Sequence, residues 1–149
     1  MSSTAPSHGD ALTSLLYRSA AVRPFGPDDL YLLEEKATRT NQQADISGYL
    51  TYRSGSFTQY LEGPTEVVVA LYESIASDSR HKIGTTVFLA VEERRFPTWS
   101  MRLLDPLWHP TGEALDAIDE LLLVPETRPD DPIVSAALDD LLGQVMLTG

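Results

Sequence analysis

Apolar residues near the start of the chain recur at every second position. In the segment 12–20, Leu15 and Tyr17 fall on one face of an extended chain, and their immediate neighbours fall on the other. Alternation with this period is typical of a β-strand with one buried face. Similar segments predict four more strands, at 46–52, 57–62, 85–92 and 99–104.

Between these strands the apolar spacing changes to three or four residues, which is the helical period. The first such stretch begins at Pro27, which suits the first position of a helix, and carries Leu30, Leu33 and Ala37 on one face. We expect this helix to end near Arg39, where a polar segment begins. Three more helices are predicted, from 65 to an end near 78–81, from about 112 to 123 and from about 131 to 146.

The resulting order over residues 12–105 is β-α-β-β-α-β-β, which is the order of a ferredoxin-like α+β fold. In that fold two helices cover one face of a mostly antiparallel sheet, and the first and third strands are central neighbours. We expect a disordered tail at 1–10, a folded domain at 11–105 and a helical C-terminal segment at 106–149. The two C-terminal helices either cap the open face of the sheet or carry an interface.

Composition excludes several classes of function. The chain has 149 residues and a net charge of −11, so binding to nucleic acid or to an anionic membrane surface is not expected. It has no cysteine, which rules out disulfides and thiolate metal sites, and no other metal site stands out. The first ten residues do not resemble a signal peptide and no segment is long and apolar enough to span a membrane, so we expect a cytoplasmic protein.

Gln59 places a primary amide among apolar side chains. It alternates with Phe57 and Leu61 on the third predicted strand, so it shares their face. A buried amide needs partners for both its donors and its acceptor. This amide is therefore either satisfied by the backbone, or it binds a ligand and is able to reverse end for end.

Tyr17 lies on the strand predicted to be the neighbour of the one that carries Gln59. A phenol with an ordinary pKa of about 10 is neutral at pH 7. It can donate a hydrogen bond to a glutamine side chain, and it can give an electron and a proton to an excited acceptor. The alternative is a core tyrosine whose hydroxyl is bonded elsewhere.

Five further residues each have a structural and a functional interpretation. Asn41 follows the first predicted helix, so it either caps that helix or bonds to the edge of a heterocycle. Arg80 and His81 end the second predicted helix, where cations are favourable, or they hold a phosphate or polyol hydroxyls. Trp99 and Met101 alternate so as to share a face of the last strand, either as core residues or beside a chromophore.

Taken together and in this order, these residues resemble the BLUF family of flavin photoreceptors. The resemblance covers about 12–105 and is carried by the segments Leu15–Ser19, Asn41, Ile46–Leu50, Phe57–Gly63, Asp78–His81 and Arg95–Met101. Several positions depart from the family, among them Thr40 and Gln42, which flank Asn41 where other members carry different polar residues. Ser47 stands where the family often has threonine, and Tyr60 stands where some members have tryptophan.

The resemblance implies a blue-light receptor that binds FAD, with FMN as the other possibility, between its two helices. Tyr17 would be the photoactive tyrosine, Gln59 the glutamine that joins it to the flavin, and Asn41 a residue that bonds the flavin ring. In the family, light draws an electron and a proton from the tyrosine, the glutamine rearranges, and the absorption shifts to the red. The other implied flavin-binding residues are Ser19, Asp78, Arg80 and His81, while Trp99 and Met101 would relay the signal.

Other functions fit less of the pattern. A flavin-free ferredoxin-like interaction module would share the fold, and the colour of the purified protein would distinguish it. An enzyme would need an activated nucleophile with a base, but only one histidine, His81, lies in the motif region, and a LOV-type photoreceptor needs a cysteine. We therefore expect a non-enzymatic receptor that signals to an unidentified partner protein. Its C-terminal helices are candidates for that contact or for a homo-oligomer interface.

Overall fold

The computed structural model describes residues 11–53, 55–104, 112–122, 127–128 and 132–148. The tail expected at 1–10 lies outside these ranges. Within them, one mixed sheet has the strand order β5-β2-β3-β1-β4-β6. The strands are β1 (Leu12–Ala21), β2 (Ser47–Arg53), β3 (Ser56–Pro64), β4 (His81–Ala90), β5 (Arg102–Leu103) and β6 (Thr127–Arg128).

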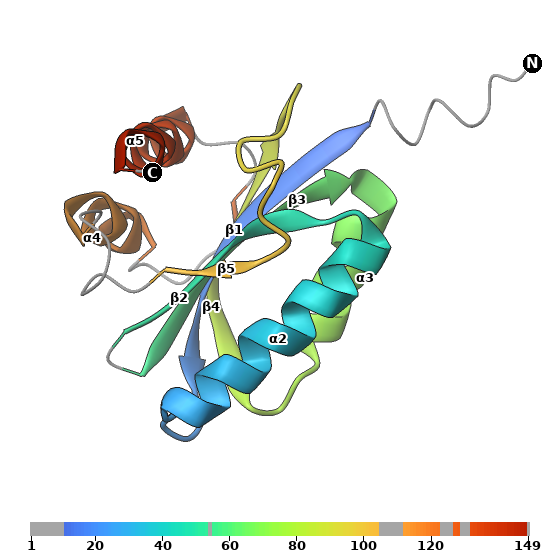
Figure 1. Ribbon diagram of the computed structural model, residues 1–149, viewed down its shortest axis with the longest axis vertical. Helices are drawn as coiled ribbons and strands as arrows, with labels where there is room; N and C mark the ends of the chain where they lie inside the picture. Colours follow the sequence, from blue (N-terminus) through green and yellow to red (C-terminus); the bar gives the residue numbers. More distant parts are fainter. Residues whose placement is uncertain (1–10, 54, 105–111, 123–126, 129–131, 149) are drawn as a thin grey trace, which may run out of the picture.

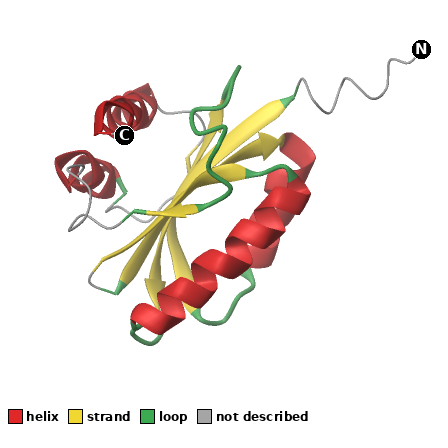
Figure 2. Cartoon of the chain, viewed as in Figure 1, coloured by secondary structure: helices red, strands yellow, loops and turns green. Residues whose placement is uncertain are grey.

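Helices lie on both faces of this sheet (Figures 1 and 2). They are α2 (Pro27–Ala44), α3 (Thr65–Ala76), α4 (Gly112–Leu121) and α5 (Pro132–Thr148). Helices α2 and α3 cover one face, and α4 and α5 lie against the other. The predicted ferredoxin-like class is confirmed, with β1 and β3 paired at the centre of the sheet. None of the described helices combines the length and the apolarity needed to cross a lipid bilayer.

Two hydrophobic cores follow from this layering, because side chains of a strand alternate between the faces of a sheet. The core beneath α2 and α3 contains Leu15, Tyr17, Leu61 and Met101. The core beneath α4 and α5 takes the alternate strand positions, including Leu16 and Tyr60, together with the apolar faces of both C-terminal helices. Tyr60 therefore lies on the opposite face of the sheet from Tyr17.

The first helix is longer than the sequence pattern indicated. We expected it to end near Arg39, but α2 continues to Ala44 and is closed by Asp45, whose φ of 60° is left-handed. The polar residues after Arg39 had suggested a break in the helix. Polarity alone does not end a helix, and aspartate is among the residues that adopt the left-handed conformation at low cost. Asn41 thus lies inside the last turn of α2 and does not cap it.

Three other element boundaries also differ from the prediction. Helix α3 ends at Ala76, so Arg80 lies in the following turn and His81 opens β4. The last predicted strand, at 99–104, is reduced to Arg102–Leu103, which pairs in parallel with β2. The segment between the C-terminal helices contains β6, a short strand that pairs in parallel with β4 and that no apolar period had indicated.

Candidate functional site

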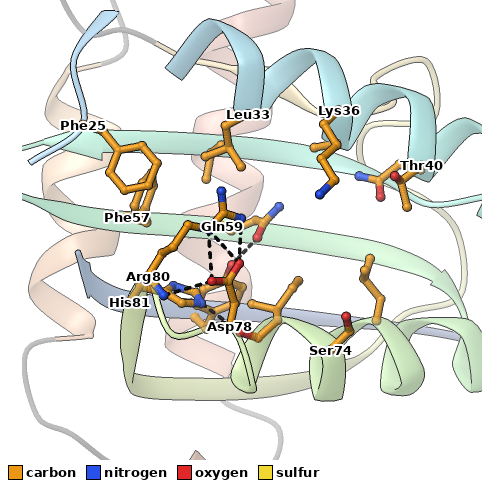
Figure 3. Close-up of a pocket in the computed structure, with 16 residues that line it drawn as sticks. Phe25, Leu33, Lys36, Thr40, Phe57, Gln59, Ser74, Asp78, Arg80 and His81 are labelled. Carbon is orange, nitrogen blue, oxygen red and sulfur yellow. Dashed lines mark hydrogen bonds and ion pairs between the residues drawn. The ribbon is translucent and has the colours of Figure 1, made fainter. Parts of the chain in front are cut away.

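A cavity of about 220 Å³ lies between α2, α3 and the face of the sheet that these helices cover (Figure 3). Its floor is formed by β1, β2 and β3, and its two long walls are the helices. The residues of the sequence analysis that line it are Tyr17, Asn41, Gln59, Asp78, Arg80 and His81. The sequence pattern had not indicated a place in the site for the other lining residues, which include Phe25, Leu33, Lys36, Thr40, Leu50 and Ser74.

Tyr17 and Gln59 are direct partners across the two central strands. They face each other in the antiparallel register of β1 and β3, and the Tyr17 hydroxyl donates a hydrogen bond to Gln59 Oε1. Tyr17 is 3% exposed and Gln59 is 7% exposed. The expected convergence of a phenol and a carboxamide at one place is therefore present.

The other end of the Gln59 amide contacts Met101. Gln59 Nε2 lies 3.2 Å from Met101 Sδ, which is a weak acceptor. Met101 is buried, and its carbonyl accepts a hydrogen bond from Thr38 of α2 at 3.3 Å. The Gln59 amide thus has a strong partner, the Tyr17 hydroxyl, at its oxygen and a weak one, the Met101 sulfur, at its nitrogen. Reversing the amide would turn Nε2 toward Tyr17 and Oε1 toward Met101.

Burial keeps the Tyr17 phenol in its protonated form. Its pKa is raised well above the ordinary value of 10, first by desolvation and then by the negative charges that Tyr72 and Asp78 can carry. A phenol that stays protonated is a permanent hydrogen-bond donor. Tyr17 is therefore protonated at neutral pH and presents a donor to Gln59.

Three buried side-chain atoms lack a hydrogen-bond partner among the described residues, and of these only Asn41 Nδ2 belongs to a residue that lines the cavity. Asn41 is 2% exposed. An unpaired buried donor costs about 1–3 kcal/mol, so such groups usually have a partner. A flavin ring carries carbonyl oxygens that would accept this bond, and the apolar walls suit its flat surface. The residues present therefore fit a flavin.

One end of the cavity carries opposite charges. The Arg80 guanidinium donates to the Asp78 carboxylate at 2.6 Å, and Arg80 is the more exposed of the two (Figure 3). His81 Nδ1 lies within hydrogen-bond distance of the Ser19 hydroxyl, at 2.7 Å, and His81 Nε2 lies 2.9 Å from the Ile75 carbonyl oxygen. Ser19 is not among the residues that line the cavity and contacts His81, which does line it, so its predicted role in flavin binding stays a prediction.

Trp99 and Met101 do not share a face, which corrects the prediction. Met101 belongs to the core around Tyr17, whereas Trp99 packs against the core on the other face of the sheet. There its ring stacks on that of Phe96, with the two ring centroids 5.0 Å apart. Alternation fails because regular strand structure begins only at Arg102, and Met101 has a φ of 152°. Trp99 is therefore absent from the cavity lining.

Beneath the site, a buried carboxylate holds the loop that leads to Met101. Glu62 of β3 is fully buried and accepts hydrogen bonds from the backbone N–H groups of Arg95 and Phe96, at 2.8 and 2.7 Å. It also accepts from the hydroxyls of Ser47 and Tyr60. Glu62 had no predicted role, although a carboxylate in a run of buried strand residues is a signal of its own.

The chain matches the family model described as "BLUF: Sensors of blue-light using FAD" over residues 12–102. The protein belongs to the BLUF family. The matched region contains both central strands and both helices that enclose the cavity.

Among curated BLUF relatives, the chain is 44% identical over 96 residues to "Photoactivated adenylate cyclase subunit beta" of Euglena longa, covering 62% of this chain and 11% of that protein. It is 36% identical over 111 residues to "Blue light- and temperature-regulated antirepressor BluF" of Escherichia coli (strain K12), covering 72% of this chain and 27% of that protein. The chain thus spans only a small part of these relatives.

Two solved structures that resemble the protein cover most of the chain. "BlrB - a BLUF protein, dark state structure" aligns with a TM-score of 0.70 and 28% identity, covering 90% of this chain and 96% of that one. "BlsA photo-activated state" aligns with a TM-score of 0.65 and 27% identity, covering 88% of this chain and 94% of that one. The likeness to both therefore extends beyond the segment that the family model matches.

Proposed function

We propose that this BLUF protein is a blue-light receptor that binds a flavin non-covalently in the cavity between α2 and α3 and signals to a partner protein. One observation carries the proposal: the hydrogen bond from Tyr17 to Gln59 lies in the wall of a cavity into which Asn41 brings an unpartnered amide. A photoactive hydrogen-bond network needs a donor, a reversible amide and a bound ring, and these residues supply the first two.

Some of these residues would bind the flavin, and others would change their hydrogen bonds under blue light. Asn41 would bond the ring edge, and Arg80 and Lys36 supply cations for the phosphate of the side chain. When bound, the flavin supplies an excited state that absorbs blue light and accepts an electron. Tyr17 is the donor of the electron and of the proton, and Gln59 is the amide that changes its hydrogen bonds. Met101 Sδ loses or keeps its contact with Nε2 according to the amide's orientation.

A connected set of contacts leads from the amide to the C-terminal helices. Gln59 contacts Met101, and the loop before Met101 is held by Glu62 through the backbone of Arg95. The Arg95 side chain then donates to Ser135 and Asp139 of α5. A change at Gln59 that moves this loop would thus bias the position of α5. A two-state switch works in this way, because a local change shifts the balance between two arrangements. We propose that α4 and α5 carry the contact with the partner.

An absorption spectrum before and after blue light tests this function. We expect the purified protein to be yellow, and its flavin bands to move slightly to the red on illumination and to return in the dark. A protein that binds flavin without this reversible shift would not be a receptor of this kind. A colourless protein that takes up no added flavin would support the interaction module instead.

A further inference from the structure

The short strand β5 forms one edge of the sheet, so only its inner side is paired with another strand. On that side Arg102 and Leu103 pair in parallel with β2, and the Leu104 N–H donates to the Leu50 carbonyl at 2.8 Å. An edge strand leaves the backbone groups of its outer side without a strand partner. Such groups need other partners wherever water does not reach them. The outer side of β5 is therefore a place where the fold has to supply something other than a strand.

Side chains of α2, which lies beside β5, take the place of that missing strand (Figure 1). The Leu103 N–H donates to the Glu34 carboxylate at 2.7 Å. The Met101 carbonyl accepts a hydrogen bond from the Thr38 hydroxyl at 3.3 Å. Two residues of an extended chain span about 6.6 Å, and four residues of a helix rise about 6 Å. Because these spacings nearly match, the two bonds form a clamp between successive turns of α2 and successive outward positions of the β5 segment.

The α2–β5 clamp holds a residue whose backbone is strained. Met101 has a φ of 152°, a conformation that residues with a side chain seldom adopt. Such strain persists only where the surrounding structure holds the residue in place, and it is common in segments that switch between two arrangements. Met101 is 2% exposed, its sulfur lies 3.2 Å from Gln59 Nε2, and its carbonyl is bonded to Thr38. The position of the sulfur against the Gln59 amide therefore depends on the bonds that hold this backbone.

The clamp is separate from the flavin cavity. Neither Glu34 nor Thr38 lines that cavity, although Leu33 and Asn41 of the same helix do. Helix α2 therefore turns one face toward the cavity and another toward β5. A change at Glu34 or Thr38 can thus alter how β5 is held without removing a residue that lines the cavity.

We propose that Glu34 and Thr38 are positioning residues of the light response, which hold the β5 segment in its resting arrangement through the α2–β5 clamp. The inference rests on the proposed function. In the resting arrangement the Met101 sulfur accepts from Gln59 Nε2, and reversal of the amide turns Nε2 away from it. The clamp keeps this acceptor in place, so it stabilises the resting orientation of the amide relative to the reversed one. A weaker clamp therefore prolongs the illuminated state, and the clamp sets the lifetime of the signal.

The rate of dark recovery of the full-length, flavin-loaded protein after blue light tests the proposal, together with hydrogen exchange of the Leu103 N–H in the dark. In Glu34→Ala we expect recovery to slow by about three- to tenfold, the range expected for one hydrogen bond, and exchange at Leu103 to rise by a similar factor. Glu34→Gln keeps an acceptor, so its recovery should lie between that of Glu34→Ala and that of the unmodified protein. Thr38→Val, which loses the hydroxyl at nearly the same volume, should slow recovery, and Thr38→Ser should restore it.

Glu35→Ala is the matched control, since Glu35 is the adjacent carboxylate of α2, pairs with Arg39, and forms no hydrogen bond to β5 within the described ranges. It should recover at the rate of the unmodified protein, and flavin affinity should be the same in every variant because the cavity lining is unaltered. An unchanged or faster recovery in both Glu34→Ala and Thr38→Val would overturn the clamp while leaving the receptor intact. Slow recovery that Glu35→Ala reproduces would overturn it as well. An unmodified protein that binds flavin without a reversible shift would instead contradict the proposed function.

Discussion

Arg95 joins the loop that leads to Met101 to the last helix of the protein. Its Nε donates to Asp139 of α5 at 2.9 Å, and its side chain is only 11% exposed. The same guanidinium donates to Ser135 at 2.6 Å and to the Tyr60 hydroxyl at 3.2 Å. This side chain thus contacts α5 on one side and the central strand β3 on the other, while its backbone is bonded to Glu62.

Replacement of Arg95 should separate light detection from the response of the C-terminal helix. In Arg95→Gln we expect the red shift to remain, because the cavity is unaltered, while the light-induced change in hydrogen exchange of α5 is lost. Removing these charge-assisted bonds should also destabilise the protein by about 1–3 kcal/mol. Hydrogen exchange in dark and lit protein, with urea unfolding alongside, measures both effects.

Arg94→Gln provides the control for this experiment. Arg94 is the neighbouring cation of the loop, but it donates to Ser47 and to the Asp45 carbonyl and makes no described contact with α5. Its replacement should leave the light-induced exchange of α5 intact. An α5 response that survives in Arg95→Gln would show that the signal takes another route.

Loss of the Tyr17 hydroxyl should abolish the spectral shift. Tyr17→Phe removes the donor to Gln59 but keeps the ring, so we expect bound flavin whose absorption no longer moves under blue light. Tyr72→Phe is the comparison, because the Tyr72 ring packs edge-on against that of Tyr17, with the ring centroids 6.2 Å apart. Among the described residues, the Tyr72 hydroxyl bonds only to the Thr86 hydroxyl. That variant should keep the shift. Light-minus-dark spectra distinguish the two.

Asn41 should matter for flavin binding and not for folding. Asn41→Leu removes the unpartnered buried Nδ2. The free energy of unfolding of the apoprotein should therefore stay equal or rise, by up to about 1–3 kcal/mol. Flavin affinity should fall roughly tenfold, as expected for the loss of a buried hydrogen bond. Urea unfolding of the apoprotein and flavin titration give the two quantities. A variant that loses stability and keeps its affinity would contradict this role.

The main features of the fold were predictable because they depend on periodicity. Alternation in β1 and β3 placed Tyr17 and Gln59 on one face, and the structure pairs them in register. The failure at the last predicted strand has a tertiary cause, because contacts from other elements overrode the local pattern. Met101 and Trp99 diverge because the loop before β5 is fixed by Glu62 and by the bond from Gly48 N–H to the Trp99 carbonyl, and not by strand pairing. No local period encodes such bonds.

The same argument applies to the parts of the cavity that the sequence did not indicate. Thr40 lines it because α2 continues past Arg39, and this continuation also places Leu33, Ala37 and Asn41 on one face at helical spacing. Ending the helix near Arg39 hid this relation. The sequence also did not indicate the second cleft, which Val22, Arg23 and Ser79 help to line, because it combines the turn after β1 with the turn before β4 and only the three-dimensional fold brings these together.

Acid should weaken the protein through Asp78. Hydrogen bonds from Arg80 lower the pKa of this carboxyl from 3.8 to about 2. The unfolded chain therefore takes up the proton at higher pH than the folded protein does, so the pair stabilises the fold above pH 3.8, and this contribution is lost as the pH falls through 2. Asp78→Asn should flatten the decline in unfolding free energy over this interval. Urea unfolding at several pH values measures it, with Glu92→Gln, an exposed carboxylate, as the control.

Met101 offers a test of whether the amide of Gln59 depends on its sulfur contact. Met101→Leu keeps nearly the same volume, so it should cost less than about 1.5 kcal/mol of stability, but it removes the acceptor that lies 3.2 Å from Gln59 Nε2. One amide orientation then loses its only described side-chain acceptor for Nε2, and the balance between the two orientations shifts. We expect flavin binding to be retained, and the dark position of the flavin bands or the rate of dark recovery to change. Identical spectra and identical recovery in Met101→Leu would show that the sulfur contact does not set the orientation of the amide.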